Sequence, residues 1–392
     1  MLLCSPPMSI QNTPQYIDTD DELIQLCDTL HSREWLAVDT EFHRDKNYYP
    51  DLCLVQLGTP ELAVCIDPLA IKDLSPLLDL LYSPSITKVM HAGRQDMEIF
   101  YYLRGDLPKP FFDTQLAAPL MGLEENIGYG SLVKAMLNVN LEKTHTRADW
   151  MRRPMPAAQI QYALDDVIYL ADIFPKMQRK LDELQRLPWL EEDFAKLTSP
   201  DLYRNPPENA WRRLRGLNKL NPQSLSIMQT LAAWREQTAQ QLNRPRNWIC
   251  KDDVLFDLAK LMPTDMNELE HIRGMSEGFV KRHGEKLLGL IEQAKTEKPK
   301  ALDDMKIRNK LSVKDYALID AMMAIVSLSA ADNQLHPSVI VSRKGLEALL
   351  NGGENESELF SGWRKKIVGE QLRAFLDGKI GLKVDQKCLV IA

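Results

Sequence analysis

The segment from Trp35 to Glu41 constrains the fold most, because an apolar run ends there in two acids. Its length and composition predict a buried β-strand. Alternate residues of a strand point to the same face, so Asp39 and Glu41 would emerge side by side. Burying two like charges together is costly unless cations offset them. Either the strand end is solvated, or the two carboxylates share divalent metals, which prefer oxygen ligands.

Strand-like and helix-like segments alternate between residues 16 and 190, which predicts an α/β fold with a mixed sheet and flanking helices. The expected strands cover residues 35–41, 52–57, 62–67 and 87–91. The expected helices cover residues 18–30, 76–81, 95–103 and 159–184. Pro175 inside the last helix predicts a kink or a break.

Two further acids lie where such a fold can bring them to the same sheet edge. Asp96 follows a strand and opens a helix, where an acid is also favoured simply as a cap or by the helix dipole. Tyr162 and Asp166 lie one helical turn apart and share a face, although Tyr162 also suits a core position. Asp165 points about 100° away from Asp166 and is expected to be solvated. Four convergent carboxylates would suffice to hold two cations roughly 3.5–4 Å apart.

Composition limits the remaining classes of protein. The chain has 392 residues, of which 44% are hydrophobic and 26% charged, as in soluble proteins with two to four domains. A net charge of −7 argues against coating nucleic acid by bulk charge. No apolar run approaches the ~20 residues of a membrane span, and the first residues do not resemble a signal peptide. The six cysteines form no C-x-x-C pair, which favours reduced thiols in the cytoplasm over zinc sites.

The C-terminal half is predicted to be mostly helical. Residues 190–207 lose periodicity and are interpreted as a linker, after which helical segments cover 208–297 and 306–380, and a strand hairpin is expected in 382–392. The segment from Tyr203 to Lys251 contains nine cationic residues and two acids, so its net charge is +7. Three tryptophans lie among them. This pattern suits phosphate contacts and base stacking, or alternatively core tryptophans beneath a solvated basic face.

Three short blocks resemble the motifs of the DEDD exonuclease family: Val38-Asp-Thr-Glu41-Phe, His91-Ala-Gly-x-x-Asp96 and Tyr162-x-x-x-Asp166. The tyrosine spacing is that of the tyrosine-type subgroup. Four more segments resemble bacterial ribonuclease D, namely Asn47-Tyr-Tyr-Pro50, Asp113-Thr-Gln115, Thr146-Arg-Ala-Asp-Trp150 and Arg153-Pro154. The likeness extends over nearly all of residues 15–380.

This resemblance implies a ribonuclease H-like 3′–5′ exoribonuclease that trims RNA, transfer RNA precursors in particular, and releases nucleoside 5′-monophosphates. By the same resemblance, Asp39 bridges two Mg²⁺ or Mn²⁺ ions, while Glu41 and Asp166 hold the ion that activates water. Asp96 serves the other ion, and Tyr162 positions the attacking water. Arg94 is a candidate phosphate contact.

Residues 208–297 resemble an HRDC domain, the helical module that RecQ-type helicases and ribonuclease D share. The similar segments are Ala210-Trp-Arg-Arg213, Ala233-Trp-Arg-Glu236, Asn243-Arg-Pro-Arg-Asn-Trp-Ile249 and Arg282-His-Gly284. Residues 302–392 resemble a second, diverged copy. We therefore expect an exonuclease domain in residues 1–195 followed by two all-α HRDC-like domains. The candidate RNA contacts are Arg94, Arg212, Arg213, Arg244 and Arg246.

The leading hypothesis is a metal-dependent exoribonuclease, monomeric and cytoplasmic, that acts on RNA with 3′ extensions. A DNA 3′ exonuclease of the proofreading type would share the metal site and differ in its substrate. A catalytically inactive RNA-binding module is the other alternative. The complete set of four acids argues against it, because binding alone gives no reason to gather carboxylates near phosphate.

Overall fold

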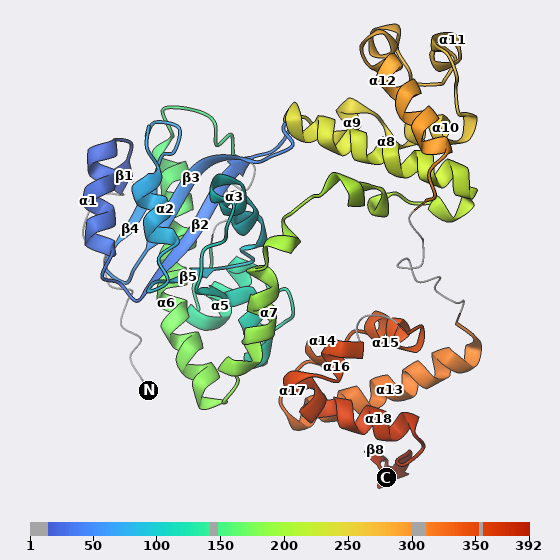
Figure 1. The fold of residues 1–392 in the computed structure, drawn as a ribbon. Coiled ribbons are helices and arrows are strands. Elements are labelled where there is room, and N and C mark those ends of the chain that lie inside the picture. The colour runs from blue at the N-terminus through green and yellow to red at the C-terminus, as the bar shows by residue number, and fades with distance from the viewer. Residues whose placement is uncertain (1–14, 142–147, 300–310, 353–355) are drawn as a thin grey trace. The chain divides into compact units, whose positions relative to one another are not determined.

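The computed structural model describes residues 15–141, 148–299, 311–352 and 356–392 (Figure 1). The chain divides into two compact units. The first comprises Met1–Glu41, Leu52–Leu202 and Lys306–Ala392, and the second comprises Phe42–Asp51 and Tyr203–Met305. The boundaries expected from the sequence remain predictions. The expected start at residue 302, and the Thr146 and Arg147 part of one motif, lie outside the described residues.

A six-stranded sheet forms the centre of the first unit, as the alternating pattern predicted. Its strands follow the order β1-β4-β3-β2-β5-β6. They span Gln15–Ile17 (β1), Trp35–His43 (β2), Asp51–Gly58 (β3), Ala63–Ile66 (β4), Thr87–Met90 (β5) and Phe111–Asp113 (β6). Strands β2, β5 and β6 pair in parallel, whereas β3 and β4 pair antiparallel. The sheet is therefore mixed, and the catalytic candidates on β2 lie near its middle.

The helices of the sheet-containing part are α1 to α7. They span Asp20–Leu30 (α1), Ser75–Leu81 (α2), Arg94–Arg104 (α3), Thr114–Ala117 (α4), Tyr129–Leu137 (α5), Ala157–Glu183 (α6) and Glu191–Leu197 (α7). Thr19 caps α1 by accepting a hydrogen bond from the backbone of Glu22, at the start of the helix that the sequence predicted. The expected helices near residues 76–81 and 95–103 correspond to α2 and α3.

Two sequence-based expectations for this part were wrong in part. Pro175 does not break α6, which continues as one helix to Glu183, and the alternative expectation of a kink stays a prediction. The turns on both sides of Pro175 carry buried residues such as Phe174 and Met177, and this burial offsets the missing backbone hydrogen bond. The supposed linker after residue 190 begins with the helix α7, because Phe194 packs edge-on against Phe112 of β6.

The C-terminal part of the first unit is helical and ends in the predicted hairpin. Its elements are α13 (Val313–Asp332), α14 (Pro337–Ile340), α15 (Arg343–Leu350), α16 (Glu356–Leu359), α17 (Gly362–Arg364), α18 (Glu370–Leu376), β7 (Leu382–Asp385) and β8 (Cys388–Ile391). One apolar core runs through both parts of the unit. Trp189 and Trp363 stack with their ring centroids 4.6 Å apart, which joins the two parts directly.

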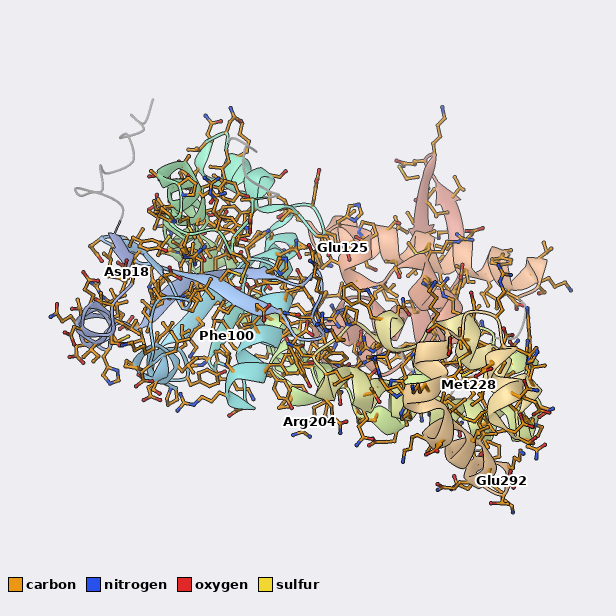
Figure 2. The ribbon with its side chains drawn as sticks, turned by 90° about the horizontal axis from the view of Figure 1, so that it is seen from above. Asp18, Phe100, Glu125, Arg204, Met228 and Glu292 are labelled. Carbon is orange, nitrogen blue, oxygen red and sulfur yellow. The ribbon has the colours of Figure 1, made fainter. Side chains whose placement is uncertain are left out.

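The second unit is helical, with its own core. Its helices are α8 (Pro222–Gln241), α9 (Arg246–Ile249), α10 (Asp252–Leu261), α11 (Met266–Glu270) and α12 (Glu277–Lys295). Trp211 is fully buried and Trp234 nearly so, which makes both of them core residues. Figure 2 labels Met228 in this core and Phe100 in the core of the first unit, both of them fully buried. In the described part of the chain, no helix is long and apolar enough to cross a membrane.

Candidate active site

Three of the four predicted acids converge. Asp39 and Glu41 leave β2 two residues apart, and Asp166 comes from α6. One carboxylate oxygen from each residue lies within 4.8 Å of the other two, a spacing that fits a shared cation. The strand alternation and the helical position predicted each side chain separately. Only the packing of α6 against the sheet brings them together.

The electrostatics of this cluster are those of acids that lack a counter-charge. Burial, followed by the charges of Asp166 and Asp96, raises the pKa of Glu41 to about 8. Burial, followed by the charge of Asp165, raises the pKa of Asp166 to about 7. Burial and the three neighbouring carboxylates also raise the pKa of Asp39 well above its usual range. Each shift shows that the ionised form is unfavourable here without a cation.

Asp96 lies beside this cluster rather than within it. It occupies the first turn of α3 and is almost fully buried. The hydroxyl of Thr40, the residue between Asp39 and Glu41, donates a hydrogen bond to the Asp96 carboxylate. Burial raises the pKa of Asp96 to about 6, although the Thr40 hydrogen bond opposes that shift. Sequence reasoning found Asp96 and missed Thr40, because a buried threonine inside a strand gives no functional signal.

A buried aspartate holds the turn that leads into α3. The carboxylate of Asp113 accepts hydrogen bonds from the backbone of Ala92 (3.2 Å) and Gly93 (2.9 Å). It also caps α4 by accepting from the backbone of Gln115 and Leu116. Ala92 has a φ of 56°, a conformation that costs energy for a residue with a side chain. These hydrogen bonds therefore stabilise the backbone geometry from which Asp96 projects.

Tyr162 lies one turn before Asp166 on α6 and is half-buried. Burial, followed by the charges of Asp166, Glu41 and Asp39, raises the pKa of its phenol to about 12. Tyr162 is therefore neutral at physiological pH and is a hydrogen-bonding group rather than an anionic base. The ring of Trp150 lies 6.3 Å away between centroids.

Two further residues, Tyr129 and Arg153, support this region. Tyr129 of α5 donates a hydrogen bond to the backbone carbonyl of Asp166 at 2.6 Å. Arg153 forms a bidentate pair with the buried carboxylate of Asp67, at 2.6 and 2.7 Å. Arg153 also donates to the carbonyl of Trp150, and so it anchors the segment that places Trp150 near Tyr162. A motif match had marked Arg153, but the sequence could not show its partner.

The predicted RNA contacts fall into two groups, which differ in whether they lie near a buried carboxylate. Arg94 opens α3 and is exposed, and Arg212 is exposed with its guanidinium 5.0 Å from the ring centroid of Trp211. Arg244 is also exposed and lies 5.8 Å from the ring centroid of Trp248. Trp248 itself is 58% exposed, unlike the two core tryptophans. An aromatic face beside a guanidinium is a surface on which a nucleobase can stack.

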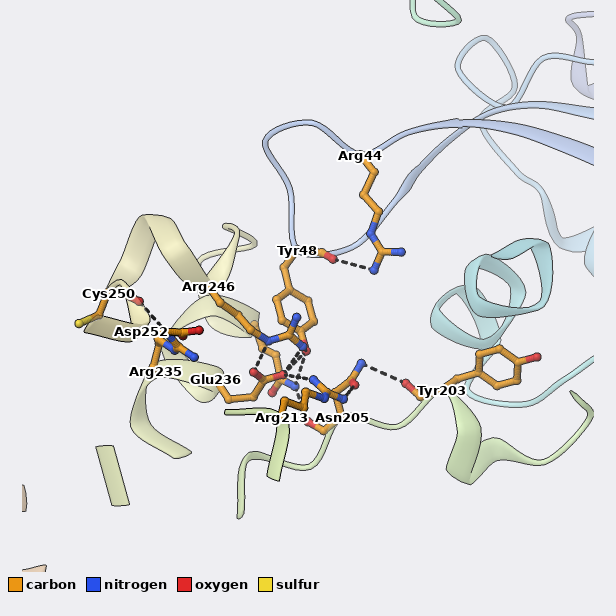
Figure 3. Close-up of polar contacts among 11 residues, drawn as sticks. Arg44, Tyr48, Tyr203, Asn205, Arg213, Arg235, Glu236, Arg246, Cys250 and Asp252 are labelled. Atoms are coloured by element: carbon orange, nitrogen blue, oxygen red, sulfur yellow. Dashed lines mark hydrogen bonds and ion pairs between the residues drawn. The ribbon is translucent and has the colours of Figure 1, made fainter. Parts of the chain in front are cut away.

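The second group is committed to a buried carboxylate within the second unit (Figure 3). The side chain of Glu236 is only 1% exposed and pairs with Arg246. Arg213 lies 3.6 Å from the same carboxylate. The hydroxyl of Tyr48, from the loop between β2 and β3, also donates to Glu236. Arg246 lies 4.7 Å from the centroid of the Tyr48 ring, and Asn243 accepts from the backbone of Tyr48 at 3.0 Å.

These contacts explain why residues 42–51 belong to the second unit although they connect two strands of the sheet. Burial alone would raise the pKa of Glu236, but hydrogen bonds from Arg246 and Tyr48 outweigh it and lower that pKa. The sequence pattern indicated basic residues here. It did not indicate that Arg246 would contact Tyr48, almost 200 positions away.

Comparisons with known proteins identify the family to which this chain belongs. Residues 14–182 match a family described as 3′–5′ exonuclease, and residues 224–291 match the HRDC domain. The chain is 35% identical to ribonuclease D of Granulibacter bethesdensis, over 96% of this chain and 95% of that protein. It is 39% identical to ribonuclease D of Sphingobium indicum, over 92% of this chain and 94% of that protein. The chain belongs to the ribonuclease D family.

A solved structure supports the assignment over the same length. The crystal structure of Escherichia coli RNase D, described as an exoribonuclease involved in structured RNA processing, has 32% sequence identity and a TM-score of 0.80. The match covers 94% of this chain and 99% of that one. Membership of the ribonuclease D family makes this chain a hydrolytic 3′–5′ exoribonuclease and confirms the predicted α/β exonuclease fold followed by an HRDC domain. Divalent metal dependence is implied by the family, and the carboxylate cluster is consistent with it.

Proposed function

We propose that this exoribonuclease removes 3′ extensions from transfer RNA precursors and releases nucleoside 5′-monophosphates. In this proposal two divalent cations, Mg²⁺ or Mn²⁺, assist the hydrolysis. The observation that carries the proposal is the convergence of carboxylates from β2 and α6 within 4.8 Å of one another, with Asp96 beside them. Transfer RNA precursors are the expected substrates because the motifs resemble those of enzymes that trim such 3′ ends.

The donor set of this cluster fits hard divalent cations. All four acids offer oxygen ligands, which Mg²⁺ and Mn²⁺ prefer over nitrogen or sulfur. Burial raises the pKa values of Glu41, Asp96 and Asp166, so a bound cation would stabilise their ionised forms. In this proposal Glu41 and Asp166 would hold one ion, Asp96 would hold the other, and Asp39 would serve both. Bound divalent ions would activate the attacking water and neutralise charge that develops on the leaving oxygen.

Tyr162 orients the attacking water in this proposal. Its raised pKa keeps the phenol protonated at neutral pH, so Tyr162 acts by hydrogen bonding rather than by removing a proton. Its position one turn before Asp166 places it beside the acids that hold the ion. The packing of Trp150 near its ring limits its rotation.

The HRDC unit would contribute RNA affinity through its exposed basic residues. Arg244 with Trp248, and Arg212, offer exposed guanidinium groups near aromatic rings. Arg94 would contact a phosphate near the exonuclease site. Contact of RNA with Arg213 and Arg246 stays a prediction. The pairing with buried Glu236 disfavours it for Arg246, whereas Arg213 lies 3.6 Å from that carboxylate and keeps half of its side chain exposed. We further propose a monomer that acts in the cytoplasm, with residues 302–392 forming a second HRDC-like domain.

One experiment tests this function. Purified full-length protein is incubated with a 3′-extended transfer RNA precursor or with DNA of matched sequence, in Mg²⁺, in Mn²⁺ or in chelator. Stepwise shortening of the RNA to 5′-monophosphates, only when metal is present, supports the proposal. Preferential digestion of DNA would instead support a proofreading-type exonuclease. Binding of RNA without any shortening would support an inactive RNA-binding module.

A further inference from the structure

Asp96 lies beside the three-acid cluster, and a side-chain hydrogen bond from Thr40 orients its carboxylate. Asp39, Glu41 and Asp166 form a cluster that shares one potential cation position, and Asp96 is not part of it. Its charge nevertheless raises the pKa of Asp39 and of Glu41, so its carboxylate lies close to theirs. A hydrogen-bond donor to an acid beside such a cluster limits the orientations that its carboxylate adopts.

Thr40 supplies that donor. Thr40 and Asp96 are buried residues, 5% and 7% exposed, and the Thr40 hydroxyl donates a hydrogen bond to Oδ1 of Asp96. A hydrogen bond to a carboxylate stabilises the ionised form and limits rotation of the group. Because Thr40 stands between Asp39 and Glu41 in the same strand, one short segment presents two ligands and orients a third. The partners that orient metal ligands typically matter 10- to 100-fold for metal affinity or activity.

The backbone beneath Asp96 is fixed independently by Asp113. The two hydrogen bonds from Ala92 and Gly93 hold the turn that starts α3. Gly93 also lies so close to Met90 that a Cβ atom would be 2.8 Å from the Cβ of that residue. The start of α3 therefore has little freedom. The remaining freedom of Asp96 is rotation of its own side chain, which is restricted by the Thr40 hydroxyl together with backbone hydrogen bonds from Thr40 and Asp96.

We propose that Thr40 is a positioning residue for Asp96, which it holds in the orientation that completes the second cation position. The proposal rests on the metal-dependent function proposed above. Removal of the Thr40 hydroxyl should weaken one metal position while RNA binding and the three-acid cluster remain.

The test uses Thr40→Val, which keeps the shape and removes the donor, and Thr40→Ser, which keeps the donor. Thr59→Val is the matched control, because Thr59 is also buried and its hydroxyl accepts backbone hydrogen bonds in the turn between β3 and β4. Mn²⁺ binding to each full-length variant is measured by calorimetry, and RNA shortening is measured as a function of Mn²⁺ concentration.

We expect Thr40→Val to weaken the second Mn²⁺ binding event about 10- to 100-fold and to raise by a similar factor the Mn²⁺ concentration that gives half-maximal rate. Thr40→Ser should stay within about 3-fold of the parent protein, and KM for RNA at saturating Mn²⁺ should stay the same in both. Thr59→Val should change only thermal stability. Parent-like Mn²⁺ binding by Thr40→Val, or a Thr40→Ser variant as weak as Thr40→Val, would overturn the inference.

The outcome also separates this inference from the proposed function. If the parent protein binds no Mn²⁺, or if Asp39→Asn retains full activity, the proposed function itself fails. If Asp39→Asn is inactive and Thr40→Val behaves like the parent, only the role of Thr40 is lost.

Discussion

Replacement of Arg246 by alanine removes the main cation that faces the buried carboxylate of Glu236. Loss of one partner of a buried ion pair typically costs about 3–5 kcal/mol, because the other charge is left uncompensated. Two features lower this value: the Arg246 side chain is 35% exposed, and Arg213 remains 3.6 Å from the carboxylate. We therefore expect the second unit to lose about 2–4 kcal/mol of stability.

The assay is amide hydrogen exchange of α8, the helix that carries Glu236, in the full-length protein. Exchange reports the stability of one segment, whereas global unfolding of a chain with several domains need not be two-state. A loss of about 2–4 kcal/mol corresponds to a fall in α8 protection of about 30- to 900-fold. Segments of the first unit, such as α6, should keep their protection.

Arg244→Ala is the matched control, because Arg244 is exposed and contacts Trp248 rather than a buried acid. It should cost at most about 1 kcal/mol. The two variants should show the opposite order in RNA affinity, with the larger loss in Arg244→Ala. Equal α8 protection in the two variants, or a cost below about 0.5 kcal/mol for Arg246→Ala, would refute the argument that Glu236 depends on Arg246.

Further predictions concern the active site and the RNA surface. Asp39→Asn should lower the rate of RNA shortening at least about 1000-fold in a gel-based digestion while circular dichroism is unchanged, and residual activity near the parent level would contradict the metal assignment. Tyr162→Phe should lower kcat about 10- to 100-fold with little change in KM, and an unchanged kcat would remove its role. Since the pKa of Glu41 is about 8 and that of Asp166 about 7, Mn²⁺ binding at pH 7 should release protons and should tighten as the pH rises to 9. Calorimetry in buffers of different ionisation enthalpy measures that release, and binding without proton release would contradict the shifts. Trp248→Ala should weaken single-stranded RNA binding by about 1–3 kcal/mol in fluorescence anisotropy, and no change would exclude stacking there.

The same carboxylates fix the sign of a stability effect in the metal-free protein. Their pKa values are higher in the folded chain than the ordinary values expected when it is unfolded, so the folded state binds more protons. The metal-free protein should therefore be most stable at low pH, where these carboxylates are protonated. Its free energy of unfolding should fall as the pH rises from about 5 through 8. Added Mn²⁺ should reverse that loss.

The sequence alone predicted the parts of the site that depend on local backbone geometry. Strand alternation places Asp39 and Glu41 on one face, and helical spacing places Tyr162 beside Asp166. The same local patterns predicted the central strands, four helices of the first unit and the helical character of the C-terminal half. These features follow from the period of each element, which is set by residues a few positions apart.

Tertiary structure decided the features that depend on distant partners. Convergence of Asp166 with Asp39 requires α6 to pack on the sheet, and the hydrogen bond from Thr40 to Asp96 joins residues 56 positions apart. Burial separated the basic residues in the same way: Arg246 faces Glu236, whereas Arg244 stays exposed beside Trp248. The sequence shows which residues are charged and which follow the period of a helix or a strand. Packing determines which charged residue contacts a buried partner, because an unpaired charge is costly once it is removed from water.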